Sequence, residues 1–309
     1  MNKTFKVAII IACAIFISFG IIACSSSNDV EIEKPDTEEP KDEEPGDDQV
    51  LKLNIATYNI RLITSADQGE RAWTNRLPWV KRIIQKYDFD ICGTQEGFKS
   101  QIYDILTMGN YDYIGVGRDD GKDKGETSAI LFKKEKFEVL DKGSFWLSET
   151  PDQVSKGWDA NINRIVSWGK FKDIETGKEF FFFNAHYDHQ GKTAQYESSK
   201  LVLTKIEEIA GENPVFYTGD LNVQPTSDTV KIIVDSGLLW DSRHSSLEPI
   251  YGTEGTFHGY NLDGKTTNRI DYIFVSKTIK VIKYGVINDD IELNKFSSDH
   301  FPVLVNAEL

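Results

Sequence analysis

Polar residues of the kinds that act in catalysis recur in this sequence directly after apolar runs typical of buried strands. Such runs include LNIATYN, FDICGTQE, FFFFNAHYDH and VFYTGDLN. NRIDYIFVS embeds Asp271 within an otherwise apolar strand, and SSDHFPV places the same kinds of residue directly before one. Because a rigid scaffold holds the ends of its strands in place, side chains there can form one preorganised site. The candidates are Asn59, Gln95, Glu96, Asn184, His186, Asp188, Asp220, Asn222, Asp271, Asp299 and His300.

Each of these residues also has an ordinary structural explanation. Asn59 could be a turn residue, Glu96 a charge at the N-terminus of a helix, and Asp220 part of an Asx-turn. The pair of Asp299 and His300, taken alone, could lie in a surface loop. Because polar groups recur at six strand ends of one chain, we interpret the set as a functional site.

Apolar periodicity places the elements that would carry these residues. Strands are predicted near residues 51–57, 89–92, 128–132, 165–171, 179–184, 214–218, 269–275, 279–284 and 301–305, and helices near 77–87, 194–210 and 227–236. Strands and helices alternate early in the chain, whereas hairpins are more frequent later. This order predicts one α/β domain with mixed sheets over residues 51–309, rather than a doubly wound parallel sheet.

The first 50 residues are predicted to lie outside the catalytic domain. A basic segment, residues 2–6, precedes the apolar residues 7–23, as in a secretory signal peptide. Ile21-Ile22-Ala23-Cys24 resembles a bacterial lipobox, which implies removal of residues 1–23 and lipidation of Cys24. An uncleaved membrane anchor is the alternative. Residues 24–50 are rich in acids and are predicted to form a disordered tether. We therefore expect a lipid-anchored protein of the cell envelope, in the outer membrane and facing either the periplasm or the outside.

The composition limits the partners of the domain. The 309 residues carry a formal net charge of −14, much of it in the acidic segment 25–49. A negative balance opposes an extended footprint on duplex DNA, because such binding depends on neutralising phosphates. After cleavage only Cys24 and Cys92 would remain, which excludes a cysteine-type zinc site, and Cys92 is predicted to be a core residue. We expect a monomer.

The order of the strand-end residues resembles the endonuclease/exonuclease/phosphatase superfamily, which includes deoxyribonuclease I, and within it a bacterial branch near the poly(A) deadenylases. The resemblance covers residues 51–309. Its most specific parts are Gly219-Asp220-Leu221-Asn222 and Ser298-Asp299-His300-Phe301-Pro302. It implies a four-layered α/β sandwich of two packed mixed β-sheets flanked by helices. It also implies a metal-dependent phosphoesterase in which water attacks a phosphodiester in line with the leaving group.

A divalent cation fits the oxygen-rich part of this set. Carboxylate and amide oxygens suit Mg²⁺ or Mn²⁺, which would polarise a phosphoryl oxygen and stabilise the leaving oxygen. Glu96 is the best candidate for a direct ligand, with Asn59 beside it. The resemblance implies that Asp299 supports the metal or its waters.

The resemblance also implies roles for the catalytic residues. Asp220 would orient or deprotonate the attacking water, and Asn222 would bind the phosphoryl oxygen. His186 and His300 would contact the phosphate. Asp271 would fix the tautomer and the orientation of His300.

Further polar and aromatic residues are candidates for substrate binding. Arg164 could pair with a phosphate bidentately, and Trp158 could stack on a base or sugar, with core packing as the alternative for the tryptophan. Glu126 lies where a strand is expected to begin, and Asp188 could contact substrate or support the site from behind. Arg61 stands where abasic-site endonucleases carry an acid, which argues against DNA repair.

These features favour a nuclease similar to 3′–5′ exonucleases, or a nucleotide phosphodiesterase. The same chemistry on a phospholipid or phosphoinositide headgroup is the alternative, although no apolar run resembles the membrane-inserting hairpin of bacterial sphingomyelinases. A third hypothesis is an inactive surface protein that binds a polyanion. All expected site residues are present, which favours an enzyme, but strand ends define the reaction and leave the substrate open.

Overall fold

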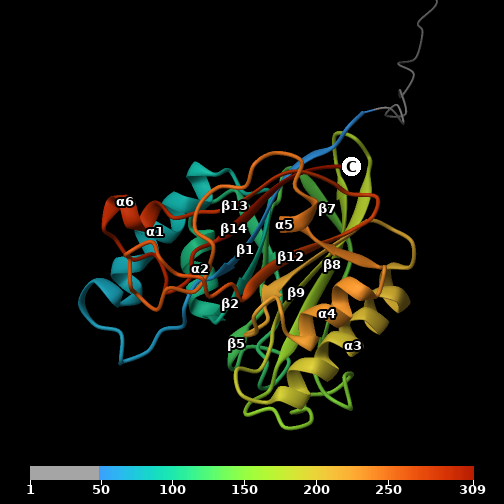
Figure 1. Ribbon diagram of the computed structural model, residues 1–309, viewed down its shortest axis with the longest axis horizontal. Helices are drawn as coiled ribbons and strands as arrows, with labels where there is room; N and C mark the ends of the chain where they lie inside the picture. The colour runs from blue at the N-terminus through green and yellow to red at the C-terminus, as the bar shows by residue number, and fades with distance from the viewer. Residues whose placement is uncertain (1–48) are drawn as a thin grey trace, which may run out of the picture. The chain divides into compact units, whose positions relative to one another are not determined.

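Two six-stranded sheets form the centre of the domain in the computed structural model, which describes residues 49–309 (Figure 1). The first sheet contains, in spatial order, β13 (Lys280–Val286), β14 (Val303–Glu308), β1 (Lys52–Asn59), β2 (Ile91–Gln95), β6 (Ile130–Lys133) and β4 (Tyr111–Ile114). The second contains β11 (Leu239–Asp241), β12 (Asp271–Ser276), β10 (Val215–Asp220), β9 (Glu179–His186), β8 (Ile165–Asp173) and β7 (Phe137–Trp146). The predicted signal peptide, Cys24 and most of the predicted tether lie outside the described residues.

Both sheets are mixed, as the sequence predicts. In the first, β1 runs parallel to β2 and antiparallel to β14. In the second, β10 runs parallel to β9 and antiparallel to β12. The predicted hairpin is formed by β8 and β9, and a separate short ribbon pairs β3 (Gly97–Phe98) with β5 (Glu126–Thr127).

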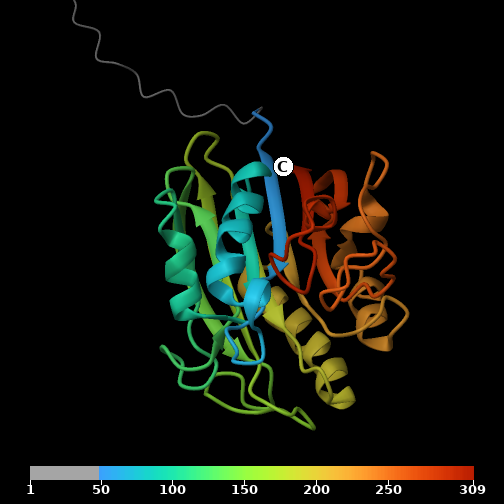
Figure 2. The same ribbon diagram turned by 90° about the vertical axis from the view of Figure 1, so that its left-hand side faces the viewer.

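Helices cover the outer faces of both sheets (Figures 1 and 2). The first sheet is covered by α1 (Trp73–Lys86) and α2 (Lys99–Leu106), and the second by α3 (Lys192–Ala210) and α4 (Asp228–Asp235). The remaining helices are the short η1 (Gly69–Arg71), α5 (Ser242–Ser245) and α6 (Asp289–Leu293). No helix within residues 49–309 is long and apolar enough to cross a membrane.

Three clusters of buried side chains fill the spaces between these four layers. Leu53 and Ile55 of β1 belong to the cluster between the sheets. Ala56 and Tyr58 of the same strand belong to the cluster under α1 and α2. The four phenylalanines 180–183 of β9 alternate in the same way between the sheet interface and α3. Strands covered on both faces are apolar on both faces, which explains these runs. The predicted four-layered sandwich is confirmed.

Some elements were not expected from the sequence, and β7 is the longest of them. It forms an edge of the second sheet, with Glu138, Asp141 and Lys142 exposed. Its register with β8 shifts between Val139 and Asp141, so a bulge interrupts the alternation of apolar residues. The pattern that predicts a strand is therefore absent. Cys92 is buried in the core, as predicted.

Candidate active site

The strand ends that carry the candidate residues meet at one edge of the two sheets. In the second sheet Asp220 is paired in register with both His186 and Asp271. In the first sheet β1 and β2 end at the corresponding edge, where the antiparallel β14 begins. The residues brought together in this way are Asn59, Glu96, His186, Asp220, Asn222, Asp271, Asp299 and His300.

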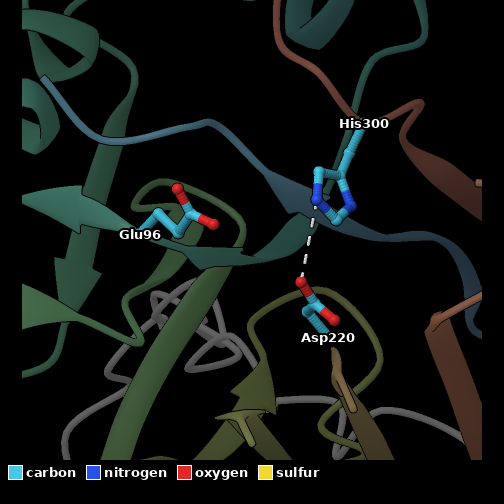
Figure 3. Close-up of side chains that lie close together, drawn as sticks. All are labelled: Glu96, Asp220 and His300. Atoms are coloured by element: carbon cyan, nitrogen blue, oxygen red, sulfur yellow. Dashed lines mark ion pairs between the residues drawn. The ribbon is translucent and has the colours of Figure 1, made fainter. Parts of the chain in front are cut away.

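Asn59 connects the two sheets at the centre of this edge. Its Nδ2 donates to Glu96 Oε1 at 3.0 Å and to Asp220 Oδ2 at 3.0 Å. Ligand atoms of Glu96, Asp220 and His300 all lie within 4.8 Å of one another (Figure 3). This group is rich in carboxylate oxygen, and it suits a hard divalent cation such as Mg²⁺ or Mn²⁺.

His300 forms a buried pair with Asp271. The distance from His300 Nδ1 to Asp271 Oδ2 is 2.9 Å, and that from His300 Nε2 to Asp220 Oδ2 is 3.8 Å. Burial lowers the pKa of His300, but the charges of Asp271, Asp220 and Asp299 outweigh it and raise this pKa to about 10. In the metal-free protein this raised pKa favours the imidazolium form of His300. Glu96 and Asp220 supply the carboxylate oxygens of the group, the ligands that a hard cation prefers.

His186 lies on another side of Asp220 and is neutral. Its Nε2 is 3.1 Å from Asn222 Nδ2 and 3.6 Å from Asp220 Oδ2. Because Asn222 Nδ2 also donates to Tyr187 O, at 3.0 Å, the amide is oriented as a donor and His186 Nε2 accepts. Burial lowers the pKa of His186 well below its usual value. Burial and the charge of Asp271 raise the pKa of Asp220.

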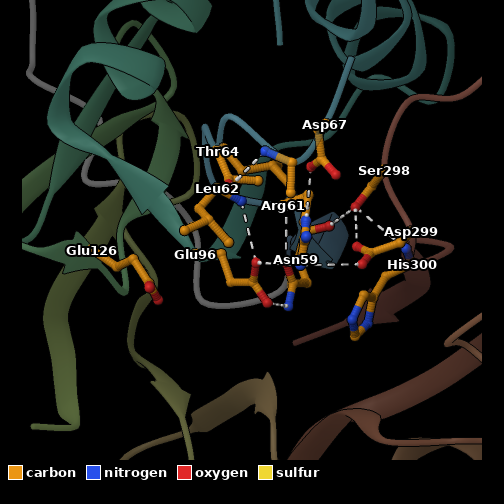
Figure 4. A network of polar contacts seen from close by, with 12 residues as sticks. Asn59, Arg61, Leu62, Thr64, Asp67, Glu96, Glu126, Ser298, Asp299 and His300 are labelled. Atoms are coloured by element: carbon orange, nitrogen blue, oxygen red, sulfur yellow. Dashed lines mark hydrogen bonds and ion pairs between the residues drawn. The ribbon is translucent and has the colours of Figure 1, made fainter. Parts of the chain in front are cut away.

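Asp299 faces Arg61 (Figure 4). Arg61 Nη1 lies 3.6 Å from Asp299 Oδ2 and 3.9 Å from Glu96 Oε2. Its Nε donates to Asp67 Oδ2 at 3.0 Å. Burial raises the pKa of Asp299. The sequence drew attention to Arg61 but gave no sign that its guanidinium would contact two of the predicted metal-binding carboxylates.

The predicted substrate residues Glu126, Arg164 and Asp188 form a charged cluster beside His186. Glu126 accepts two hydrogen bonds from Arg118, at 2.6 and 2.8 Å, and lies 3.9 Å from His186 Nδ1. Asp188 lies 3.6 Å from Arg164 Nε and accepts hydrogen bonds from backbone N–H groups of two loops. Asp188 thus has the contacts of a residue that supports the site from behind.

Arg164 lines a small cavity of about 240 Å³ together with His186 and Asn222. It is only 4% exposed, and its Nε and Nη1 have no hydrogen-bond partner within residues 49–309. Such a group is suited to an anion. Trp158 does not line this cavity, nor does it line the larger cavity of about 640 Å³ beside Glu96, Asp220 and His300. Its backbone N–H donates to Glu149.

A cavity of about 640 Å³ opens over the group of Glu96, Asp220 and His300. Its lining also contains Gln224, Phe257 and Asn268, which the sequence did not indicate. Gln224 and Asn268 are hydrogen-bonded to each other, and the Phe257 ring lies 4.9 Å from that of His300. Single polar or aromatic residues in loops are too common to be recognised from sequence.

Comparisons with known proteins agree with this geometry. The sequence model of the Endonuclease/Exonuclease/phosphatase family matches residues 56–300. An endonuclease/exonuclease/phosphatase family protein from Bacteroides thetaiotaomicron is 45% identical, and its structure aligns over 84% of this chain and 99% of its own with a TM-score of 0.80. A mannosyl-6-phosphatase of the same organism is 45% identical over 82% and 99% of the two chains, with a TM-score of 0.79. The catalytic domain of human Nocturnin shares the fold at 17% identity, over 84% and 96% of the chains, with a TM-score of 0.64.

Two packed mixed sheets with acids, amides and imidazoles at their strand ends make up a phosphoesterase fold. The chain belongs to the Endonuclease/Exonuclease/phosphatase family. Enzymes of this family are phosphoric ester hydrolases that typically use divalent metals. The predicted family is therefore confirmed, whereas the lipoprotein character and the branch near the deadenylases stay predictions.

Proposed function

We propose that the protein is a divalent-metal-dependent hydrolase that removes phosphate from a small phosphorylated sugar. The cavity over the group of Glu96, Asp220 and His300 carries the proposal, because about 640 Å³ is the size of a site for a small molecule. Phe257 offers an apolar wall for a sugar ring, and Asn268 offers an amide for its hydroxyl groups. The 45% identity with a mannosyl-6-phosphatase supports this substrate class.

Asp220 would accept the proton of the attacking water. Its raised pKa suits a base that works near neutral pH. Both of its oxygens are held, because Asn59 Nδ2 donates to Oδ2 at 3.0 Å and the backbone N–H of Asn222 donates to Oδ1 at 2.9 Å. A carboxylate fixed in this way needs little reorganisation when the proton moves.

Positive charge and donors would stabilise the phosphoryl oxygens. The His300 imidazolium can donate from Nε2, since Nδ1 is held by Asp271. Arg164 Nη1 has no hydrogen-bond partner within residues 49–309, and Arg164 lines a cavity together with the neutral His186. Glu96 would hold the divalent cation, which neutralises charge on the phosphoryl group when it is bound.

A substrate panel tests this proposal. Release of phosphate from mannose 6-phosphate and from p-nitrophenyl phosphate would be compared with hydrolysis of RNA, sphingomyelin and a phosphoinositide, in Mg²⁺, Mn²⁺ or a chelator. We expect the sugar phosphate to have the highest kcat/KM and the chelator to abolish turnover. Preference for RNA would favour the nuclease hypothesis instead, and preference for either lipid the headgroup hypothesis.

A variant of the cavity wall tests the sugar itself. Asn268→Ala should raise KM for mannose 6-phosphate about tenfold, because the loss of one polar contact costs roughly 1–1.5 kcal/mol. p-Nitrophenyl phosphate has no hydroxyl groups in its leaving group and is the matched control. An equal loss on both substrates would contradict contact between Asn268 and the sugar.

A further inference from the structure

The guanidinium of Arg61 lies between two acids of the site. Its Nη1 is 3.9 Å from Glu96 Oε2 on one side and 3.6 Å from Asp299 Oδ2 on the other (Figure 4). The other oxygen of Glu96, Oε1, is connected through Asn59 Nδ2 to Asp220, the second acid of the group that suits a divalent cation. The edge of the sheets thus offers two positions for positive charge, and Arg61 fills one of them.

Arg61 is anchored in this position along its whole length. Its backbone N–H donates to Asn59 Oδ1 at 3.0 Å, and its carbonyl accepts from Arg76 and Gln101 at 3.0 and 2.9 Å. Its Nε donates to Asp67 Oδ2 at 3.0 Å. The backbone adopts φ 56°, in the left-handed region that a non-glycine residue rarely occupies. These contacts fix the guanidinium beside Glu96 and Asp299 rather than leaving it in solvent.

We propose that Arg61 is a built-in cation that limits the site to one divalent ion and weakens the binding of that ion. A second ion between Glu96 and Asp299 would have to displace the guanidinium. An ion held by Glu96 would experience repulsion from this fixed positive charge, in a partly buried site where screening by water is reduced. Arg61 also lines the cavity of about 640 Å³, so its charge would lie beside a substrate bound there. This inference rests on the metal dependence proposed above.

Binding of Mn²⁺ to the purified chain, without substrate, tests the inference. Isothermal titration gives the number and affinity of the ions, and electron paramagnetic resonance shows whether two bound ions lie close together. Arg61→Asn removes the charge, and asparagine tolerates the left-handed backbone. The wild type should bind one ion, and Arg61→Asn should bind Mn²⁺ about tenfold more tightly or better. Arg61→Asp, which reverses the charge, should bind a second, spin-coupled ion.

Two further variants serve as controls. Arg61→Lys keeps the charge and should still bind one ion, with an affinity within a few-fold of the wild type. Lys280→Gln removes an exposed positive charge that pairs with Glu308, at the opposite end of β14 from His300. It should leave Mn²⁺ binding unchanged.

The outcomes separate this inference from the proposed function. Two ions in the wild type, or equal affinity in Arg61→Asn and the wild type, would overturn the role of Arg61 and leave metal dependence standing. An equal effect of Lys280→Gln would also overturn it, since the effect would then be one of net charge. No binding of Mn²⁺ to any variant would remove the metal dependence itself.

Discussion

At the scale of single residues, the site contains two titratable groups whose states depend on each other. Asp220 and His300 are both buried, and each charge stabilises the other. His300 also pairs with Asp271 at 2.9 Å, so it stays charged at neutral pH. A cationic donor beside a carboxylate with a raised pKa is an arrangement suited to general acid–base catalysis.

The first prediction concerns the protonation of His300. In the metal-free protein, NMR of the imidazole nitrogens should show His300 titrating near pH 10. In Asp271→Asn, which loses the main favourable charge, the pKa should fall by several units toward or below the usual value of about 6.5. A midpoint that is the same in both proteins would exclude Asp271 as the cause.

The same pair has a consequence for stability. The pKa of His300 is higher in the folded protein than in the unfolded chain. The charged pair therefore makes its full contribution to the free energy of unfolding below about pH 6.5, and this contribution is lost as the pH rises through about 10. Urea unfolding should therefore show a large stability difference between wild type and Asp271→Asn near pH 6 and a small one above pH 10. A difference that grows with pH would contradict the charged pair.

The second prediction is that His300 and Asp271 act as a unit in turnover. His300→Ala should lower kcat by about 10²–10⁴, because donation and positioning are lost together. Asp271→Asn should lower it by a smaller factor, and the double variant should be hardly worse than His300→Ala alone. The assay uses the substrate that the panel identifies. Losses that multiply would mean that Asp271 serves Asp220 rather than His300.

Much of the candidate site could be predicted from the sequence, because strand ends combine an apolar run with a polar residue. Two strand-end residues were nevertheless misplaced by this reasoning. Gln95 and Asn184 are hydrogen-bonded to each other at 2.7 Å between the sheets. Asn184 shares a strand face with His186 but lies two residues deeper, where the opposite sheet covers it. Whether a residue near a strand end reaches the site or is covered depends on how the two sheets pack. The pattern of residue types along one strand does not contain this information.

At the scale of elements, a buried polar layer below the site holds the two sheets together. It consists of Thr57, Gln95, Asn184 and Thr218. Gln95 Nε2 donates across the sheet interface to Asn184 Oδ1, and Asn184 Nδ2 donates back to the carbonyls of Thr94 and Ala129 at 2.8 and 3.0 Å. All of these donors are paired, although Gln95 Oε1 has no hydrogen-bond partner within residues 49–309, and paired buried polar groups favour one packing arrangement. This layer therefore sets the spacing of the sheets whose ends carry the catalytic groups.

The third prediction tests that spacing at Gly93, which lies in β2 opposite the layer. A Cβ at Gly93 would overlap Thr218 Oγ1 and lie 2.5 Å from Asn184 Oδ1. Gly93→Ala should reduce the free energy of unfolding by about 1–3 kcal/mol, because overpacking forces the sheets apart. It should also lower kcat, since Glu96 and Asp220 come from different sheets. Urea denaturation and the substrate assay measure the two effects.

A matched glycine shows whether close packing is the cause. Gly109 has φ 88°, and nothing lies within 4 Å of a Cβ built on it. Gly109→Asn adds a side chain in open space with a tolerated backbone. This variant should reduce the free energy of unfolding by less than Gly93→Ala does, and it should leave kcat unchanged. Equal costs would indicate that glycine matters at these positions through the backbone alone.

Strands were predicted where both of their faces are buried. Helices were predicted where apolar residues recur at helical spacing over a long stretch. The strand observed as β10 and the helix observed as α3 are of this kind. β7 was not predicted, because it is an exposed edge with a bulge. The equally short α4 was predicted and begins after the capping residue Ser227, whereas α2 begins after Phe98, which makes no side-chain cap, and was not predicted. Short and exposed elements form because neighbouring strands and sheets stabilise them, and that information is not local in the sequence.

At the scale of the whole molecule, the domain must be considered together with the 48 residues that precede the described part. Their sequence predicts a lipidated Cys24 followed by an acidic tether. We propose that this segment anchors the catalytic domain to an envelope membrane at a distance set by the tether. The cavity would then remain accessible to a soluble sugar phosphate.

The fourth prediction tests this anchor through Cys24→Ser, which removes the thiol that would carry the lipid. The variant should move from the membrane fraction to the soluble fraction, because acyl chains contribute roughly 0.8 kcal/mol per buried CH₂ group and their loss leaves nothing comparable. Ser25→Ala changes the neighbouring residue, keeps the thiol and should stay with the membrane.

Partition into detergent and incorporation of labelled fatty acid measure the anchor directly. Activity on a soluble substrate should be the same in all three proteins, because the catalytic domain begins beyond the tether. Wild-type protein found in the soluble periplasmic fraction would show that the segment is only a secretion signal, and retention of Cys24→Ser in the membrane would favour the uncleaved apolar anchor.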